Sequence, residues 1–435
     1  MARATSSPRT LPRGLQPLAS RNFRNVWIGS FISNIGTWVE TVAGGIYITQ
    51  LTGKASWTGI VAAAGLLPGA VLGPLGGALA DRIARKPLLI ITTLIEAISA
   101  AGLALLIAFD LATPLAITAL VFIAGCAGVV AWPTFSTILP ELIPAEQLPS
   151  AIALSTAQWN LGRIIGPIVA GVVIAIGGYT WAFAFNALSF IAVIIAILPI
   201  VIPRPKAPQH GVLRSIRAGL GYVRRDRGER VAIMLFAANC FLIAPFIALI
   251  PAVALKIFDF EQPGTSIMTT AQGVGAVIVA VSLGALMHRF RIRRVLRVAF
   301  FGVPFATALY AIAPTFALAT AALVLLGGVY LGTFSGVMTV AQTRSTREVR
   351  GRVMSLFTST LAVFYPLGSI TQGWLGDKIG LRTTTLLGAG AMLVFLAGLS
   401  LIQGGFAPGL DDPLVMGAPG TEVPSTDMPT EVIPD

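Results

Sequence analysis

Three ionisable residues stand inside long apolar stretches of this sequence, where a charge needs either a partner or a function: Glu40, Glu96 and Arg163. If these stretches cross a membrane, each charge at a helix centre costs about 2.5 to 3.5 kcal/mol unless it is paired or hydrated. Glu40 is interpreted as a residue that takes up a proton or contacts a ligand, or alternatively as the structural partner of Arg163. Arg163 could hold a carboxylate through two hydrogen bonds or fix a kinked backbone, and the structural role is its default interpretation.

Other reactive side chains do not gather in a pattern that supports catalysis. His210 and His288 fall in basic loops, and Cys126 and Cys240 stand alone inside apolar segments. Such thiols behave as small hydrophobic residues, and no spacing typical of a metal site or of a Ser/His/Asp group is present. The sequence also lacks a Gly-x4-Gly-Lys-[Ser/Thr] phosphate-binding loop. We therefore expect no enzyme activity, no metal and no cofactor.

The elements that position these residues must be solvated by lipid. The chain is 55% hydrophobic and only 11% charged, with a mean hydropathy of +0.83, which leaves too few polar side chains to cover a soluble globule. Backbone amides in hydrocarbon need internal partners, and the alternation typical of barrel strands is absent, so the segments are helices. We predict an all-α membrane protein with transmembrane helices at residues 25 to 50, 57 to 80, 87 to 109, 114 to 139, 151 to 176, 179 to 202, 231 to 255, 265 to 287, 295 to 313, 315 to 341, 353 to 375 and 383 to 404.

The basic residues predict the orientation of these helices, because Lys and Arg accumulate on the cytoplasmic side. The chain has 30 of them. We number the loops between the predicted helices from the N-terminus. Arg163 lies inside a helix, and four basic residues lie in odd-numbered loops: Lys54, Lys256, Lys378 and Arg382. All the others lie in the N-terminal tail or in even-numbered loops. Both termini are therefore predicted to be cytoplasmic. The formal charge of +12 is a topology signal, and no nucleic-acid partner is expected.

The polar interruptions divide the chain into five parts. We predict a cytoplasmic basic tail at 1–24, an N-terminal six-helix bundle at 25–202, a cytoplasmic amphipathic connector at 203–230, a C-terminal six-helix bundle at 231–404 and a disordered acidic cytoplasmic tail at 405–435. The alternative for the connector is a solvated linker. Gly166, Gly171 and Gly178 precede Gly368, Gly373 and Gly380 by the same offset, which indicates duplicated halves.

One loop carries a family resemblance. The stretch Gly77-Ala-Leu-Ala-Asp81-Arg82-Ile-Ala-Arg85-Lys86 resembles the signature loop of the major facilitator superfamily. The resemblance implies two six-helix bundles and a gating latch formed by these residues, in which Asp81 engages the start of span eleven near 351 to 353. In the second half, His288 stands where this pattern has an aspartate.

A second motif lies in span five. Gly162, Gly166, Pro167 and Gly171 resemble the glycine-proline motif of antiporter branches of the superfamily, at the interface between the halves. The alternative interpretation is ordinary packing between small residues. The stretches 21 to 27, 33 to 36, 219 to 226 and 350 to 355 further resemble the branch that includes the enterobactin exporter and macrolide efflux pumps.

The family layout implies which residues face a central cavity. Span one would line it and carry Glu40 there, whereas span three, with Glu96, would lie toward the outside of its bundle. Large amphipathic cavities combine aromatic residues with sparse polar groups. The remaining cavity candidates are Thr37, Tyr47, Asn239, Tyr310, Gln342 and Tyr365.

The resemblance implies a monomeric secondary active transporter in the cell inner (plasma) membrane. Without a nucleotide-binding loop, active transport must use an ion gradient, and the proton is the natural choice. We expect a proton-coupled exporter of a small amphipathic organic compound, such as a drug, siderophore or other secondary metabolite. The alternatives are an uptake transporter or a lysophospholipid flippase and, more remotely, a membrane-embedded enzyme or a receptor.

Overall fold

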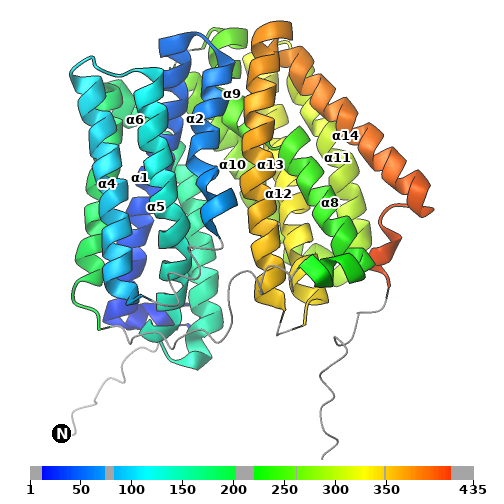
Figure 1. Ribbon diagram of the computed structural model, residues 1–435, viewed down its shortest axis with the longest axis horizontal. Coiled ribbons are helices and arrows are strands. Elements are labelled where there is room, and N and C mark those ends of the chain that lie inside the picture. The colour runs from blue at the N-terminus through cyan, green and yellow to red at the C-terminus, as the bar shows by residue number, and fades with distance from the viewer. Residues whose placement is uncertain (1–11, 74–82, 202–219, 261, 347–348, 413–435) are drawn as a thin grey trace, which may run out of the picture.

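The protein is an assembly of long helices, shown in Figure 1. The computed structural model describes residues 12–73, 83–201, 220–260, 262–346 and 349–412. Within those ranges no strand is present, and the α-helices are α1 (Arg21–Thr52), α2 (Ala55–Leu66), α4 (Arg85–Ala108), α5 (Pro114–Ile138), α6 (Leu148–Ile197), α8 (Arg227–Leu242), α9 (Pro245–Phe258), α10 (Gln262–Arg289), α11 (Ile292–Ile312), α12 (Phe316–Arg344), α13 (Arg350–Ile379) and α14 (Leu381–Gln403).

Ten of the helical stretches in these ranges are long and apolar enough to cross a membrane. The helix α1 is not among the ten, although its 32 residues exceed the roughly 20 that a bilayer requires. The helix α6 counts once, but Gly178 interrupts its 50 residues with a φ of 73° and divides it into two arms. If α1 is counted as a membrane span and the two arms of α6 are counted separately, the described helices correspond to the predicted spans. The all-α membrane fold is confirmed.

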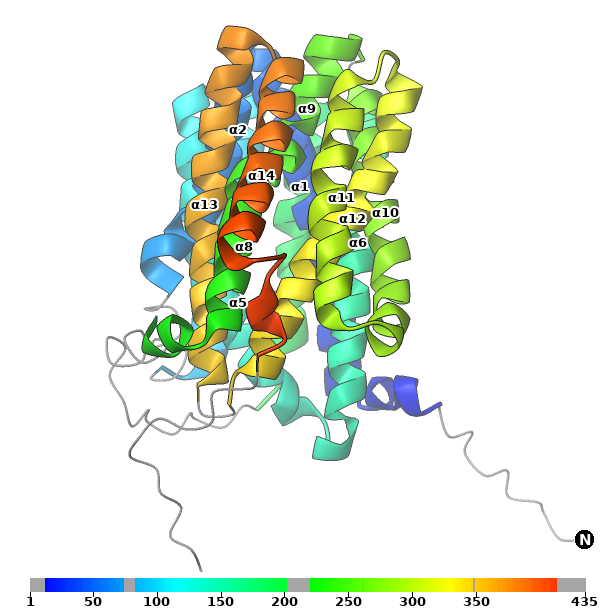
Figure 2. The same cartoon turned by 90° about the vertical axis from the view of Figure 1, so that its right-hand side faces the viewer.

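The helices form two bundles, which Figure 1 shows side by side. One bundle holds α1 to α6, and the other holds α8 to α14. Figure 2 shows the first and last described residues at the same end of the molecule. We call this end the terminal face; it includes Arg21, Arg85 and Arg344. The opposite end, which includes Lys54, Lys256 and Asp377, is the distal face.

Both arms of α6 pack closely against α1, because a small residue on one of the two helices lies at each contact. A Cβ at Gly36 would lie 2.5 Å from Asn186 Oδ1 of the second arm. On the other side, a Cβ at Gly162 of the first arm would lie 3.2 Å from the Cβ of Asn34, and one at Gly166 would lie 2.2 Å from the Cβ of Trp38. The helix α1 therefore lies between the two arms, with a different set of side chains toward each.

The two bundles meet closely where α2 lies along α13. A Cβ at Gly59 of α2 would stand 2.2 Å from the backbone oxygen of Ser369, and a Cβ at Gly373 of α13 would stand 2.7 Å from that of Ala55. These glycines allow the backbones to approach as closely as small residues do in membrane helix pairs. Among the glycines of the predicted interface motif, Gly171 is the one that faces the other bundle, since a Cβ placed on it would lie 3.3 Å from Ser266 Oγ of α10.

The chain continues past α14 into a packed segment at the terminal face. Arg344 donates hydrogen bonds to the backbone oxygens of Leu410 and Asp412 at 3.2 and 3.1 Å, and Arg293 forms an ion pair with Asp411. Phe406 and Leu410 are buried. The predicted start of the acidic tail at residue 405 thus falls inside a docked segment, and 413–435 lie outside the described residues.

Candidate functional site

A polar group lies between α1 and the second arm of α6, inside the first bundle. Asn186 donates a hydrogen bond from Nδ2 to Glu40 Oε2 at 2.5 Å. Ser189 donates to Asn186 Oδ1 at 3.0 Å, which orients the amide with its nitrogen toward the carboxylate. Gly36 precedes Glu40 by four residues, so both lie on the same side of α1. This glycine leaves room for the Asn186 side chain.

Glu96 of α4 belongs to the same region of the bundle. Its charge interacts with that of Glu40, and its Oε1 lies 3.3 Å from the position that a Cβ on Gly128 of α5 would take. Among the described residues, neither glutamate forms an ion pair. The first bundle therefore holds two carboxyl groups that have no cation partner among the described residues, whereas the family resemblance implied that Glu96 lies toward the outside of its bundle.

Arg163 does not pair with Glu40, and the geometry of α1 explains why. The guanidinium lies over the ring of Trp38, with 5.9 Å from Cζ to the ring centroid. Trp38 and Glu40 are two residues apart, which places them on roughly opposite sides of a helix with 3.6 residues per turn. One side of α1 thus meets Arg163 and the other meets Asn186. A cation over a tryptophan ring gains about 0.5 to 2 kcal/mol.

Arg163 also faces the second bundle. Tyr330 of α12 and Tyr365 of α13 lie near enough to influence its electrostatics, so the predicted cavity residue Tyr365 belongs to the same region. The backbone oxygen of Arg163 lies 3.2 Å from the position of a Cβ on Gly273 of α10. This arginine therefore sits where the two bundles meet.

The other predicted cavity residues are dispersed. Thr37 donates to the backbone oxygen of Ser33, and Tyr47 packs edge-on against Tyr179 with 5.1 Å between ring centroids. Asn239 is fully buried and donates to Thr333 Oγ1 at 3.2 Å. Tyr310 is buried in the second bundle, whereas Gln342 is exposed.

The predicted gating latch is described only in part. Gly77, Asp81 and Arg82 lie outside the described residues. Arg85 forms an ion pair with Glu141 at 3.3 Å, and Lys86 donates to the backbone oxygen of Leu198 at 2.6 Å. Both basic residues thus fasten the start of α4 to neighbouring segments of its own bundle.

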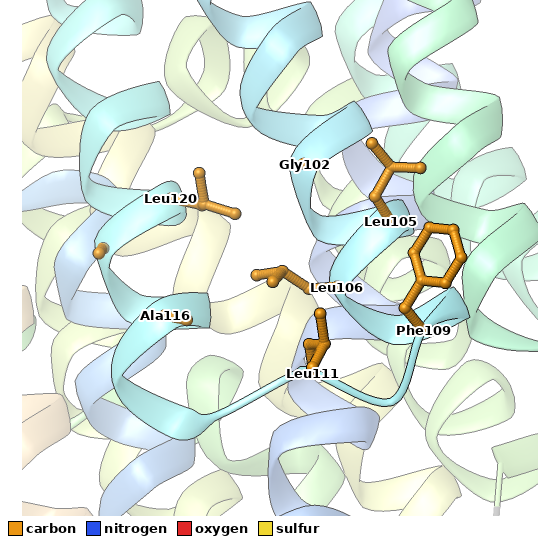
Figure 3. Close-up of a pocket in the computed structure, with 8 residues that line it drawn as sticks. Gly102, Leu105, Leu106, Phe109, Leu111, Ala116 and Leu120 are labelled. Carbon is orange, nitrogen blue, oxygen red and sulfur yellow. The ribbon is translucent and has the colours of Figure 1, made fainter.

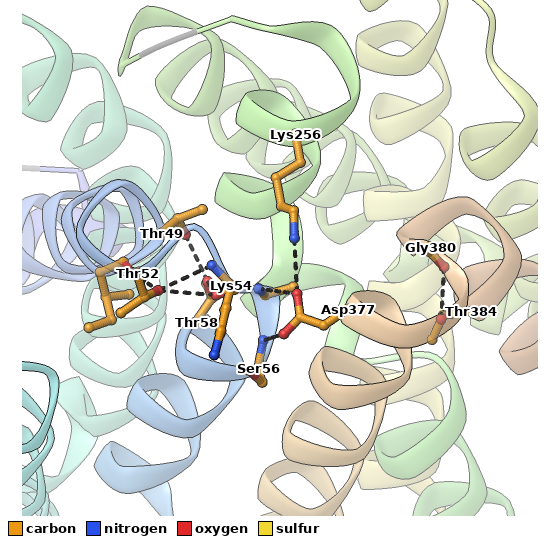
Figure 4. A network of polar contacts seen from close by, with 11 residues as sticks. Thr49, Thr52, Lys54, Ser56, Thr58, Lys256, Asp377, Gly380 and Thr384 are labelled. Carbon is orange, nitrogen blue, oxygen red and sulfur yellow. Dashed lines mark hydrogen bonds and ion pairs between the residues drawn. The ribbon is translucent and has the colours of Figure 1, made fainter.

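A polar contact that the sequence did not reveal joins the bundles at the distal face, shown in Figure 4. Asp377 of α13 accepts hydrogen bonds from the backbone N–H groups of Ala55 and Ser56 at 2.8 and 2.9 Å, and it pairs with Lys256 at 2.9 Å. The first helical N–H groups of α2 lack partners within the helix and carry partial positive charge, which a carboxylate satisfies. One carboxylate of the second bundle thus holds the start of a helix in the first.

A pocket of about 520 Å³ opens between α4 and α5 near the loop that joins them. Figure 3 shows that leucine, alanine and phenylalanine side chains line it, among them Leu106, Phe109 and Leu120. It offers no polar side chain to orient a ligand. The pocket therefore does not extend the site around Glu40 and Arg163.

Sequence reasoning also missed a row of tryptophans beside Arg163. Trp38 lies 6.2 Å from Trp159, and Trp159 lies 5.5 Å from Trp132 of α5, measured between ring centroids. Trp159 lies four residues before Arg163, a spacing that places two side chains on the same side of a helix. That spacing was the available signal for Trp159, whereas Trp38 and Trp132 come from other helices.

Comparisons with known proteins agree with this architecture. The family profile of transmembrane secretion effectors matches residues 13–405. Macrolide efflux protein A from Streptococcus pyogenes is 26% identical over 385 residues, which cover 86% of this chain and 94% of that protein. The enterobactin exporter EntS from Escherichia coli is 26% identical over 383 residues, which cover 87% of each chain.

Solved structures show the same fold at low sequence identity. A bacterial homolog of the human lysosomal transporter Spinster, inward-facing and occupied, has a TM-score of 0.71 at 13% identity and covers 90% of this chain and 99% of its own. The nucleoside transporter NupG has a TM-score of 0.68 at 18% identity and covers 88% of this chain and 99% of its own. At these identities the likeness concerns the fold alone.

Proposed function

The chain belongs to the transmembrane secretion effectors of the major facilitator superfamily, and from that premise we propose that it is a proton-coupled exporter of a small amphipathic organic compound. Membership of this family makes the protein a secondary transporter and not an enzyme. Export is supported by two relatives whose names describe efflux of a macrolide and export of enterobactin. The macrolide and enterobactin are named for those relatives and are not assigned to this chain.

Proton coupling is supported by the two glutamates of the first bundle, Glu40 and Glu96, because neither has a cation partner among the described residues. Two carboxylates at membrane depth are costly to ionise together, since each is desolvated and repels the other. Asn186 supplies one hydrogen bond to Glu40 but no charge, and Arg163 lies on the far side of α1. A proton on the pair removes the excess charge. We assign the coupling proton to Glu40, with Glu96 as the neighbour that favours its uptake.

The orientation of the protein is part of this proposal. We infer that the terminal face is cytoplasmic, because it carries Arg85, Lys86 and Arg344 and the basic residues of a protein's loops gather on that side. In this orientation the distal face lies on the outer side of the membrane. The protein then acts as a monomer in the inner membrane, with residues 25–202 and 231–404 rocking about the contact between them.

The Glu40→Gln variant tests the coupling, since glutamine keeps the shape and the hydrogen bond from Asn186 but cannot release a proton. In proteoliposomes loaded with a radiolabelled macrolide or siderophore probe, we expect a pH gradient to drive transport by the wild type and not by this variant. Exchange of labelled for unlabelled probe should persist in both. Glu146→Gln removes an exposed carboxylate and serves as the control. Gradient-driven transport by Glu40→Gln at the wild-type rate would refute the assignment.

A further inference from the structure

We propose that Arg163 and Trp38 bind an anionic group of the transported compound, so that the protein carries amphipathic organic anions. This inference rests on the proposed transport function and adds the charge of the compound. The two residues come from different helices, α6 and α1, and they are held together by the packing of Gly162 and Gly166 against α1. The site is thus built by the fold of the first bundle.

Unused hydrogen-bond donors distinguish this site. Arg163 Nε and Trp38 Nε1 are both buried, and neither has a hydrogen-bond partner among the described residues. The guanidinium lies over the Trp38 ring at 5.9 Å and forms no ion pair within the part of the chain that the structure describes. Buried donors left without acceptors are destabilising. A ligand that brings a carboxylate or phosphate oxygen would satisfy both donors and the charge together.

The nearest acids and aromatics support an anion over a cation. Glu40 points to the opposite side of α1, where it accepts a hydrogen bond from Asn186. Tyr330 and Tyr365 of the second bundle lie in the same region as Arg163, and tyrosine hydroxyls can donate hydrogen bonds to an anion. Contributions from both bundles mean that the site changes when the bundles rock, as a transport site must.

The tryptophan row, Trp38, Trp159 and Trp132, indicates what the rest of the compound is like. The row leads from Arg163 across α6 to α5, and its exposure rises along the way, with Trp159 39% and Trp132 63% exposed. Aromatic faces bind flat apolar bodies by stacking. The site therefore suits a compound with a flat apolar body and an anionic group at one end.

Matched probes test the charge preference with purified protein. We would measure binding of four pyrene compounds that share one arm, ending in a carboxylate, a phosphate, a neutral amide or an ammonium group. We expect the wild type to bind an anionic probe about tenfold or more tightly than the amide, as a charge-assisted hydrogen bond allows. Preference for only one of the two anions would identify which group the site takes.

Variants then assign the preference to Arg163. Arg163→Gln should bind all four probes equally, and Arg163→Lys should restore part of the preference for anions. Trp38→Phe keeps an aromatic ring but loses the indole N–H, and should weaken anion binding less than Arg163→Gln. Arg382→Gln is the matched control, because Arg382 also lies over an aromatic ring, 5.7 Å from the centroid of Phe258, but at the distal face.

The possible outcomes separate this inference from the transport proposal. Equal wild-type affinity for all four probes, tighter binding of the ammonium probe, or an unchanged preference in Arg163→Gln would overturn the anionic site while leaving gradient-driven export intact. Conversely, loss of gradient dependence in the wild type together with a retained anion preference would overturn proton coupling and leave the anionic site standing.

Discussion

The proton site and the ligand site that we propose lie on opposite sides of one helix of the first bundle. Glu40 meets Asn186 at 2.5 Å on one side of α1, and Trp38 meets Arg163 on the other. A movement of α1 between the arms of α6 would change both contacts at once. If both proposed roles hold, the spacing of two residues between Trp38 and Glu40 links protonation directly to ligand binding.

Gly36 should be a sensitive position for this proton site. A methyl group there would lie 2.3 Å from Ser189 Oγ and 2.5 Å from Asn186 Oδ1. We expect Gly36→Ala to displace Asn186 from Glu40, to lower stability by about 1 to 3 kcal/mol as overpacking does, and to slow gradient-driven transport. The measurements are thermal unfolding in detergent and transport in proteoliposomes.

Gly44→Ala is the control on the same helix, since the nearest atom to its added methyl group would be Phe183 Cζ at an ordinary 3.8 Å. It should change neither measurement appreciably. If both substitutions lowered stability and transport equally, α1 would tolerate no added volume at either glycine, and Gly36 would have no special role.

The sequence identified some of these residues but not their partners. Glu40 and Arg163 stood out because charges are rare in apolar segments. Their contacts depend on how α1 lies between the two arms of α6, which no local pattern encodes. Asn186 and Trp38 were therefore missed, and the alternative pairing of Glu40 with Arg163 stayed open until the structure separated them.

At the scale of elements, the second bundle is fastened at the terminal face by a buried ion pair. Arg344, the last residue of α12, pairs with Asp226 at 3.0 Å, and Asp226 also caps the start of α8 by accepting from the Glu229 N–H at 2.8 Å. The exposed fractions of the two paired side chains are 7% and 0%. One carboxylate thus joins the start of α8 to the end of α12.

Asp226→Asn should therefore destabilise the protein strongly. Removing one partner of a buried pair leaves an uncompensated charge, which typically costs about 3 to 5 kcal/mol. We expect a clearly lower Tm for the purified protein.

Glu141→Gln breaks the more exposed pair with Arg85 and should lower stability by less than about 1 kcal/mol, as surface pairs do. If the Tm of Asp226→Asn were no lower than that of Glu141→Gln, the buried pair of Arg344 and Asp226 would not stabilise the protein as expected.

Helix positions were largely predictable at this scale, because long apolar stretches bounded by Gly, Pro and charge leave few alternatives in lipid. The docked segment after α14 was not. Its composition is typical of a disordered tail, whereas tertiary contacts hold it in place: the hydrogen bonds and ion pair from Arg344 and Arg293 and the burial of Phe406 and Leu410. Composition describes a segment in isolation and carries no information about a partner elsewhere in the chain.

For the molecule as a whole, hydrogen bonds join the two bundles at the distal face. Asp377 holds the start of α2 through the N–H groups of Ala55 and Ser56. A transporter that alternates between two access states must break this contact when that face opens. Its strength therefore helps to set the balance between the two states.

Asp377→Asn should shift that balance toward opening of the distal face, because the amide loses the charge that attracts the α2 N-terminus and Lys256. We expect a longer distance distribution between spin labels on exposed positions 54 and 378, measured after both native cysteines are replaced by serine. Asp259→Asn removes another exposed carboxylate at the same face and should leave the distances unchanged. Identical distributions in all three proteins would rule out this role for Asp377.

The packed segment that follows α14 also limits how far the chain can be shortened from its C-terminus. A chain cut at Gln403 would leave the Arg344 guanidinium without the carbonyl oxygens of Leu410 and Asp412 and would uncover Phe406 and Leu410. Purification tags and fluorescent reporters should accordingly be joined beyond Asp412, where they leave that arginine fully engaged.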